Sequence, residues 1–314
     1  MGPYLAVPRK EKESVDEENS KFRYGATGMQ GWRNTMEDSH IAHLDLGNGV
    51  AFFGVYDGHG GNEVAEFVRD HLVDELKKLD SYKSGDYEQC LKDIYLKIDE
   101  ILVTPAAKEK LKSYQKSQDR ASSMFGGGGE DIAHNAGCTA CSAIITPNEI
   151  IVGNAGDSRA VLAVKKNDKF TAVDLSVDHK PDLPEEKQRI ERAGGFVEDS
   201  RVKGILALSR SLGDLEYKTE TSVAVKDQMI TAFPEVRRER IVPGETSFLI
   251  LACDGIWDCL SSQEAVNLVG ELLPKKKKIS EVVEDMFDKI IASDVASSGG
   301  IGCDNMTCVV IQFK

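Results

Sequence analysis

Short apolar runs, each ended by glycine, asparagine or aspartate, constrain the fold of this chain more than any other feature. The earlier runs are FRYGATGMQ, HIAHLDL and VAFFGVYDG, and the later ones are TACSAIIT, EIIVGNA, SRAVLAV, SFLILACDG and DNMTCVVIQF. Their length and composition predict β-strands, and the Pro-Asn and Gly-Asp turns between consecutive runs predict antiparallel hairpins. A membrane-spanning helix needs about 18 uninterrupted apolar residues, and no run reaches that length.

Helical patterns are grouped between these runs. Apolar residues recur at intervals of three and four over 62–79 and 86–102, which predicts two amphipathic helices. The segment PEEKQRIERAGG (184–195) starts with proline and acids and ends in two glycines, and SSQEAVNLVGELL and ISEVVEDMFDKIIAS indicate two more helices. Grouped strands and grouped helices predict an α+β sandwich of layers with a second sheet.

Two segments read as irregular. Residues 8–20 are charged and lack aromatics, so we expect a loose lead-in over 1–21 before a single domain over 22–314. Residues 113–136 are polar with four consecutive glycines, which predicts a mobile loop without the G-K-[ST] of a nucleotide-binding loop. Gly2 raises the prospect of N-myristoylation and membrane association, but Ala6 stands where that motif needs serine or threonine.

Charge and cysteine content limit the partners and the compartment. The 314 residues carry 39 Lys and Arg against 52 Asp and Glu, a net charge of −13, which disfavours nucleic acid as a partner. The seven cysteines are an odd number and lie mostly within apolar runs, as expected for a reducing compartment. We therefore expect a monomer in the cytoplasm, or also in the nucleus, without a transmembrane segment.

Acids beside glycine at the ends of the expected strands are the candidate chemistry. Asp57, Asp157, Asp254 and Asp304 each follow or precede an apolar run. One such acid alone is usually a turn or helix-cap residue, but four suggest that they converge. A site made of oxygen ligands favours Mg²⁺ or Mn²⁺ over zinc. A pair of such ions supports hydrolysis of a phosphate ester.

Several spaced motifs, taken together, resemble one family. In order they are GWRNTMEDSH, VYDGHGG, GCTA with GNAGDSRAVL, DHKPDLPEEKQRIERAGG, LALSRSLGD, LACDGIWD and CDNMT, between about Arg23 and Phe313. The sequence thus resembles the metal-dependent serine/threonine protein phosphatases of type 2C. The resemblance implies a four-layer sandwich, with two central antiparallel β-sheets flanked by helices and a metal centre at one end.

The resemblance also implies roles for individual residues. Glu37, Asp57 and the Gly58 carbonyl would hold one ion, and Asp57, Asp254 and Asp304 a second. Asp157 and Asp258, with Asp254, match the acids that hold a weaker third ion in some members. Asp38 would orient water at the ions, Arg33 would bind the phosphate, and His59 would protonate the leaving oxygen. The segment from His179 to Gly195 matches the flap beside the active site.

Three functions compete for this sequence. The first is hydrolysis of phosphoserine and phosphothreonine in proteins by metal-activated water. The second is a pseudophosphatase that binds phosphoproteins or regulatory partners without turnover, although such relatives have typically lost metal acids that are all present here. The third is a metal-dependent hydrolase of small phosphate esters, which shares the site and differs in its substrate.

Overall fold

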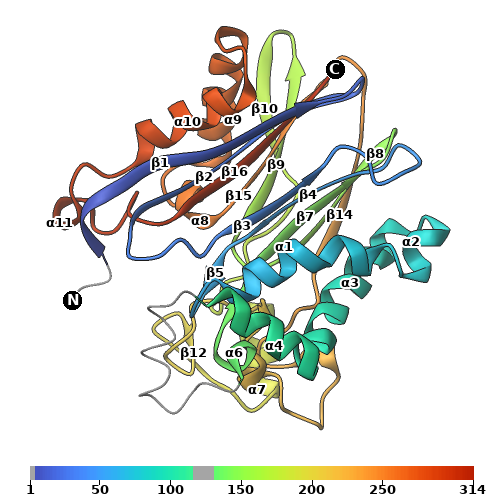
Figure 1. Ribbon diagram of the computed structural model, residues 1–314, viewed down its shortest axis with the longest axis vertical. Helices are drawn as coiled ribbons and strands as arrows, with labels where there is room; N and C mark the ends of the chain where they lie inside the picture. The colour runs from blue at the N-terminus through green and yellow to red at the C-terminus, as the bar shows by residue number, and fades with distance from the viewer. Residues whose placement is uncertain (1–3, 116–130) are drawn as a thin grey trace.

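Two antiparallel sheets stack face to face at the centre of the molecule (Figure 1). The computed structural model describes residues 4–115 and 131–314. One sheet has six strands, in the order β1 (Tyr4–Glu18), β2 (Phe22–Arg33), β16 (Met306–Phe313), β15 (Thr246–Ala252), β9 (Arg159–Lys166) and β10 (Lys169–Asp174). The other has five, in the order β14 (Glu235–Arg240), β8 (Glu149–Ala155), β7 (Ala140–Ile145), β4 (Ala51–Tyr56) and β3 (Ser39–His43).

Helices cover the outer face of each sheet, so the sandwich has the expected four layers (Figure 1). The five-stranded sheet is covered by α1 (Glu63–Leu76) and α3 (Tyr87–Leu102), close to the ranges expected from their periodicity. The six-stranded sheet is covered by α9 (Ser262–Leu272) and α10 (Ile279–Ile290). Between the sheets lies a third apolar layer, to which Phe53, Val152 and Leu251 contribute completely buried side chains. Burial of both faces explains why the central strands β4, β7, β15 and β16 are apolar over most of their length.

Smaller elements complete the chain. A three-stranded sheet joins β13 (Leu212–Gly213), β6 (Gly137–Cys138) and β5 (Gly58–His59), and β11 (Val197–Glu198) pairs with β12 (Arg201–Val202). The short helices are α2 (Asp80–Ser84), α4 (Pro105–Tyr114), α6 (Ile132–Asn135), α7 (Pro184–Arg192), α8 (Asp254–Trp257) and α11 (Val295–Ser298). Three 3₁₀ turns, η1 (Leu215–Tyr217), η2 (Val225–Asp227) and η3 (Leu273–Lys275), occur within connections. None of these described helices has the length and apolar content to span a bilayer.

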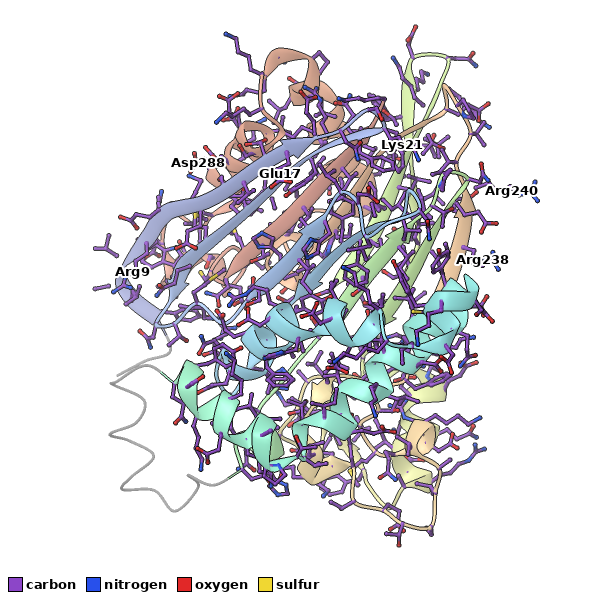
Figure 2. The ribbon with its side chains drawn as sticks, turned by 45° about the vertical axis from the view of Figure 1, so that its right-hand side comes forward. Arg9, Glu17, Lys21, Arg238, Arg240 and Asp288 are labelled. Carbon is purple, nitrogen blue, oxygen red and sulfur yellow. The ribbon has the colours of Figure 1, made fainter. Side chains whose placement is uncertain are left out.

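The expectation of a loose lead-in is wrong for residues 4–18, which form strand β1 at the edge of the six-stranded sheet. This strand carries few apolar residues because its contacts with α10 are polar: Lys12 pairs with Asp288 at 2.7 Å, and Asp16 accepts a hydrogen bond from the Ser280 amide at 2.8 Å. Figure 2 shows charged side chains on one edge strand of each sheet, with Arg9 and Glu17 on β1 and Arg238 and Arg240 on β14. Charges on edge strands oppose pairing with a second sheet.

The glycine-rich segment is only partly described. Residues 116–130 of the expected 113–136 loop lie outside the described residues, as does Gly2. At the two borders of that loop the chain is helical, since α4 ends at Tyr114 and α6 spans Ile132–Asn135. The loop prediction is therefore too wide at both ends.

Candidate metal centre and active site

The candidate acids meet because antiparallel strands alternate in direction. In the six-stranded sheet, β2 and β15 end at the edge where β16 and β9 begin. In the five-stranded sheet, β8 and β4 end at the edge where β7 and β3 begin. One edge of the sandwich therefore carries the residues at or just after the ends of β2, β15, β8 and β4. It also carries the residues just before the starts of β16, β9, β7 and β3. The residues placed there are Arg33, Asp38, Asp57, Thr139, Asp157, Asp254 and Asp304.

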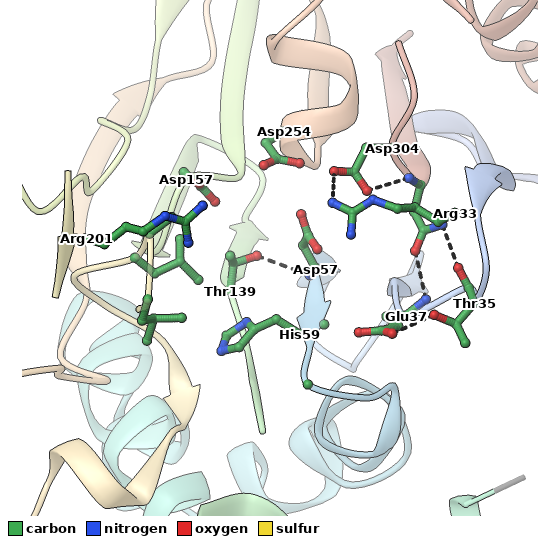
Figure 3. Close-up of a pocket in the computed structure, with 16 residues that line it drawn as sticks. Arg33, Thr35, Glu37, Asp57, His59, Thr139, Asp157, Arg201, Asp254 and Asp304 are labelled. Carbon is green, nitrogen blue, oxygen red and sulfur yellow. Dashed lines mark hydrogen bonds and ion pairs between the residues drawn. The ribbon is translucent and has the colours of Figure 1, made fainter. Parts of the chain in front are cut away.

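A cleft of about 470 Å³ opens at this shared edge. Figure 3 shows Asp57, Asp254 and Asp304 facing one another, with Asp157, Arg33, Glu37 and His59 around them. Ten of the lining residues are Arg33, Thr35, Glu37, Asp57, Gly58, His59, Asp157, Arg201, Asp254 and Asp304. Each sheet thus contributes acids to one cavity, as the sequence pattern predicts.

Asp57, Asp157 and Asp254 are close enough to share a cation. One carboxylate oxygen from each lies within 4.8 Å of the others. Burial, reinforced by the charges of Asp38 and the other acids, raises the pKa of Asp57 well above its usual value. Burial and the charge of Asp157 do the same for Asp254. Among the described residues, no Lys, Arg or His forms an ion pair with Asp57 or Asp254. A divalent cation would relieve this repulsion.

The strand end at Asp254 packs directly onto the backbone beside Asp304. A Cβ on Gly255 would collide with the carbonyl oxygen of Asn305, so glycine is required for this approach. This glycine therefore brings two acid-bearing segments together.

Glu37 is held by polar contacts from three segments. The Thr35 hydroxyl donates to its carboxylate at 2.6 Å and the Gly61 amide donates at 3.2 Å. The backbone amide of Glu37 donates to the side-chain oxygen of Asn305 at 2.9 Å. The carboxylate therefore reaches the cleft from an ordered loop.

Arg33 and His59, the expected phosphate-binding and proton-donating residues, both line the cleft. The Arg33 guanidinium donates to Asp304 at 2.5 Å, which orients it beside the acids (Figure 3). His59 Nε2 contacts the carboxylate of Asp214 at 2.7 Å. Burial would lower the pKa of His59, but the charge of Asp214 and its hydrogen bond outweigh burial and raise the pKa.

The remaining predicted residues are Asp38, Asp157 and Asp258, and of these three only Asp157 lines the cleft. Asp38 is buried behind Asp57 and lines a second cavity of about 630 Å³, and burial raises its pKa to about 6. Asp157 forms an ion pair with Lys180, so a protein cation already lies beside one ligand of the expected third ion. Asp258 is exposed and is absent from the residues that line the cleft.

Four residues at the site were not predicted: Lys180, Arg201, Asp214 and Asn305. The motifs DHKP, SLGD and DNMT contain three of them, so the family pattern carried a signal that could have assigned a role. Arg201 lies in EDSRVKG, outside the motifs used, and only the folded chain brings it to the cleft.

Comparison with known proteins identifies relatives over the whole chain. The model of the family described as protein phosphatase 2C matches residues 22–299. Two proteins of Paramecium tetraurelia, named "Probable protein phosphatase 2C 3" and "Protein phosphatase 2C 1", are 45% and 44% identical over 318 residues, with 100% of each chain covered. A solved serine-threonine phosphatase 2C from Toxoplasma gondii has the same fold, with a TM-score of 0.75, 24% identity, and coverage of 98% of this chain and 100% of that one.

The matched residues include the cleft acids Glu37, Asp57, Asp157 and Asp254, whereas Asp304 lies just beyond the matched range. Relatives at this identity span the whole chain, and the stacked sheets are those of the solved phosphatase. The chain therefore belongs to the protein phosphatase 2C family of metal-dependent phosphoprotein phosphatases.

Proposed function

We propose that this protein hydrolyses phosphoserine and phosphothreonine in proteins, with two Mg²⁺ or Mn²⁺ ions at the cleft. The observation that carries the proposal is the set of oxygen ligands on Asp57, Asp157 and Asp254, in one cavity with Arg33 and His59. Carboxylate oxygens are the ligands that these hard cations prefer. The acid-rich donor set therefore fits the metal type that the family requires.

Glu37, Asp57 and the Gly58 carbonyl would hold one ion, and Asp57, Asp254 and Asp304 the other. When bound, the ions would activate water and neutralise phosphoryl charge. A weaker third ion would use Asp157, Asp254 and Asp258, and it would compete with the ammonium group of Lys180 for Asp157.

Arg33 would bind the substrate phosphoryl group through its planar fork of donors. The pair with Asp304 limits its rotation, so the guanidinium is presented beside the acids. Attack of water on phosphorus breaks the bond to the seryl or threonyl oxygen, which leaves with the electron pair. His59 would donate a proton to that oxygen and regain one from solvent, and Asp38 would orient the attacking water.

The decisive measurement is release of phosphate from a phosphoserine peptide with Mn²⁺, with Mg²⁺ and with excess chelator. We expect turnover with either metal and none in chelator. Asp57→Asn keeps the shape of the side chain but removes its charge, and should lower kcat/KM by roughly 100-fold or more. Asp168→Asn, on a side chain that is 97% exposed and outside the cleft, is the matched control and should leave the rate unchanged.

Other outcomes separate the competing functions. Phosphopeptide binding without turnover in either metal would support a pseudophosphatase. A kcat/KM for small phosphate esters above that for phosphopeptides would support the small-ester hydrolase, and equal hydrolysis of a phosphotyrosine peptide would contradict the serine/threonine assignment. Monomeric state and a cytoplasmic or nuclear location stay predictions.

A further inference from the structure

Asp214 is a buried carboxylate whose strongest contact is with a residue of the cleft. It is 2% exposed and directly follows strand β13, and one of its oxygens lies 2.7 Å from Nε2 of His59. Among the described residues, Nδ1 of the same imidazole has no hydrogen-bond partner. The contact to Asp214 therefore leaves Nδ1 as the ring nitrogen available to a substrate.

The three-stranded sheet fixes the relative position of the two residues. His59 on β5 and Gly213 on β13 both pair with Gly137 of the central strand β6. A Cβ on Gly137 would lie 2.5 Å from Oδ2 of Asp214, so only glycine leaves room for the carboxylate. Strand pairing and the missing side chain together allow Asp214 to reach across β6 to the imidazole.

A second set of contacts holds the Asp214 loop in place. The Ser211 hydroxyl donates to the Asp214 carboxylate, and the Asp214 amide donates to the Ala136 carbonyl at 3.0 Å. Asp99, on helix α3, accepts from the Gly213 amide at 2.9 Å and from Lys218 at 2.5 Å. The carboxylate that contacts His59 is thus ordered independently of His59.

We propose that Asp214 is a positioning residue that holds the His59 imidazole with Nδ1 toward the leaving oxygen of the substrate. The proposal rests on the proposed function, in which His59 donates a proton to the seryl or threonyl oxygen. When both ring nitrogens carry a proton, the hydrogen bond from Nε2 to the carboxylate fixes the ring orientation and leaves the Nδ1 proton for transfer, as a carboxylate orients the ring in histidine-dependent catalysis elsewhere. Asp214 itself does not contact the substrate and transfers no proton.

Leaving-group dependence tests this role, because a seryl oxygen needs a proton to depart whereas p-nitrophenolate does not. We expect Asp214→Asn to lower kcat on a phosphoserine peptide by about 10- to 100-fold, and kcat on p-nitrophenyl phosphate by less than about threefold. His59→Ala should show the same selectivity. In the His59→Ala background, Asp214→Asn should cost less than about twofold more on the peptide, because it acts through the imidazole.

Asp99→Asn is the matched control, since Asp99 is also a buried carboxylate that orders the same loop but does not contact His59. Asp99→Asn should lower the melting temperature, and it should change kcat on the two substrates by one common factor. Two results would overturn the proposal. One is an equal loss of kcat on both substrates in Asp214→Asn, and the other is a full additional loss of kcat when Asp214→Asn is combined with His59→Ala.

Two further results keep the test interpretable. If Asp214→Asn does not fold, Ser211→Ala removes one hydrogen bond from the same carboxylate and should give a smaller, still peptide-selective loss of about two- to tenfold. Equal losses on both substrates in that variant would also reject the role. Wild-type protein that hydrolyses neither substrate in Mn²⁺ would instead reject the proposed function.

Discussion

The buried side chain of Asn305, just before β16, links that strand to β2 and to the loop between β2 and β3. Its amide donates to the carbonyls of Gln30 and Thr35 at 2.8 and 2.9 Å, and its oxygen accepts from the Glu37 amide. Asn305→Ala should lower the free energy of unfolding by roughly 1 to 3 kcal/mol, because buried backbone groups lose their partners. It should also raise the Mn²⁺ concentration for half-maximal activity about tenfold, because Glu37 is no longer held. Urea unfolding and a Mn²⁺ titration measure both effects.

Asn267→Ala is the control, because this asparagine is exposed on α9 and, among the described residues, its side chain hydrogen-bonds only with Gln263. We expect this variant to change the free energy of unfolding by no more than about 0.5 kcal/mol and to leave the Mn²⁺ concentration for half-maximal activity unchanged. A tenfold shift in Mn²⁺ requirement without loss of stability in Asn305→Ala would contradict the linkage between the two effects.

At the residue scale, the sequence predicts the acids of the cleft better than the residues that hold the site side chains in position. Asp57, Asp254 and Asp304 could be found because each stands at the boundary of an apolar run. The motifs LALSRSLGD and CDNMT contain Asp214 and Asn305, but the roles of these two residues do not follow from the local sequence alone, because their partners lie far away in the chain. Asp214 reaches His59 across 155 positions, and Asn305 reaches Glu37 across 268. Local patterns carry no information about such pairs unless a family motif supplies it.

At the element scale, helices and buried strands were predictable and the edge strand β1 was not. The periodic segments became α1, α3, α9 and α10 because one apolar face of each helix covers a sheet. In β1, polar contacts replace an apolar face, and Asp16 accepts from the Ser280 amide at the start of α10. A strand held this way has the composition of a disordered segment, so hydrophobic periodicity does not detect it.

The helix α7 in the segment that matches the flap depends on one buried acid, Glu186. Burial opposes its ionisation, but the hydrogen bond from Arg210 and the charges of Arg189 and Arg210 lower its pKa to about 2. A lowered pKa stabilises the folded state fully above the unfolded value near 4.5, and this contribution is lost as the pH falls toward 2. About 2 kcal/mol of it should be lost between pH 7 and pH 3.

Glu186→Gln isolates this contribution. The stability difference between wild type and Glu186→Gln should shrink by about 2 kcal/mol from pH 7 to pH 3, measured by urea unfolding at each pH. Glu264→Gln, at an exposed capping position on α9, should show a smaller change. A difference that stays constant with pH would show that Glu186 is not held as an anion in the folded protein.

At the scale of the whole molecule, the stacked sheets concentrate like charges at one end. Alternating strand directions bring acids from five segments to a single edge, where Arg33 pairs with Asp304 and Lys180 with Asp157, and no described Lys, Arg or His pairs with Asp57 or Asp254. The net charge of −13 is therefore unevenly distributed, and the apoprotein carries an unfavourable acid cluster. Bound cations would remove this repulsion only in the folded state, where the ligands are together.

Mn²⁺ or Mg²⁺ should therefore raise the melting temperature in a concentration-dependent way. A ligand that binds only the folded state adds about 2.7 kcal/mol of stability at 100 times its dissociation constant. Thermal unfolding monitored by circular dichroism should shift upward along a Mn²⁺ titration in wild type and in Asp168→Asn. The shift should be much smaller in Asp57→Asn, although this variant, with less repulsion, should start from a higher melting temperature without metal. Because turnover is not involved, equal Mn²⁺ shifts in wild type and Asp57→Asn would remove Asp57 from the metal centre whatever the substrate.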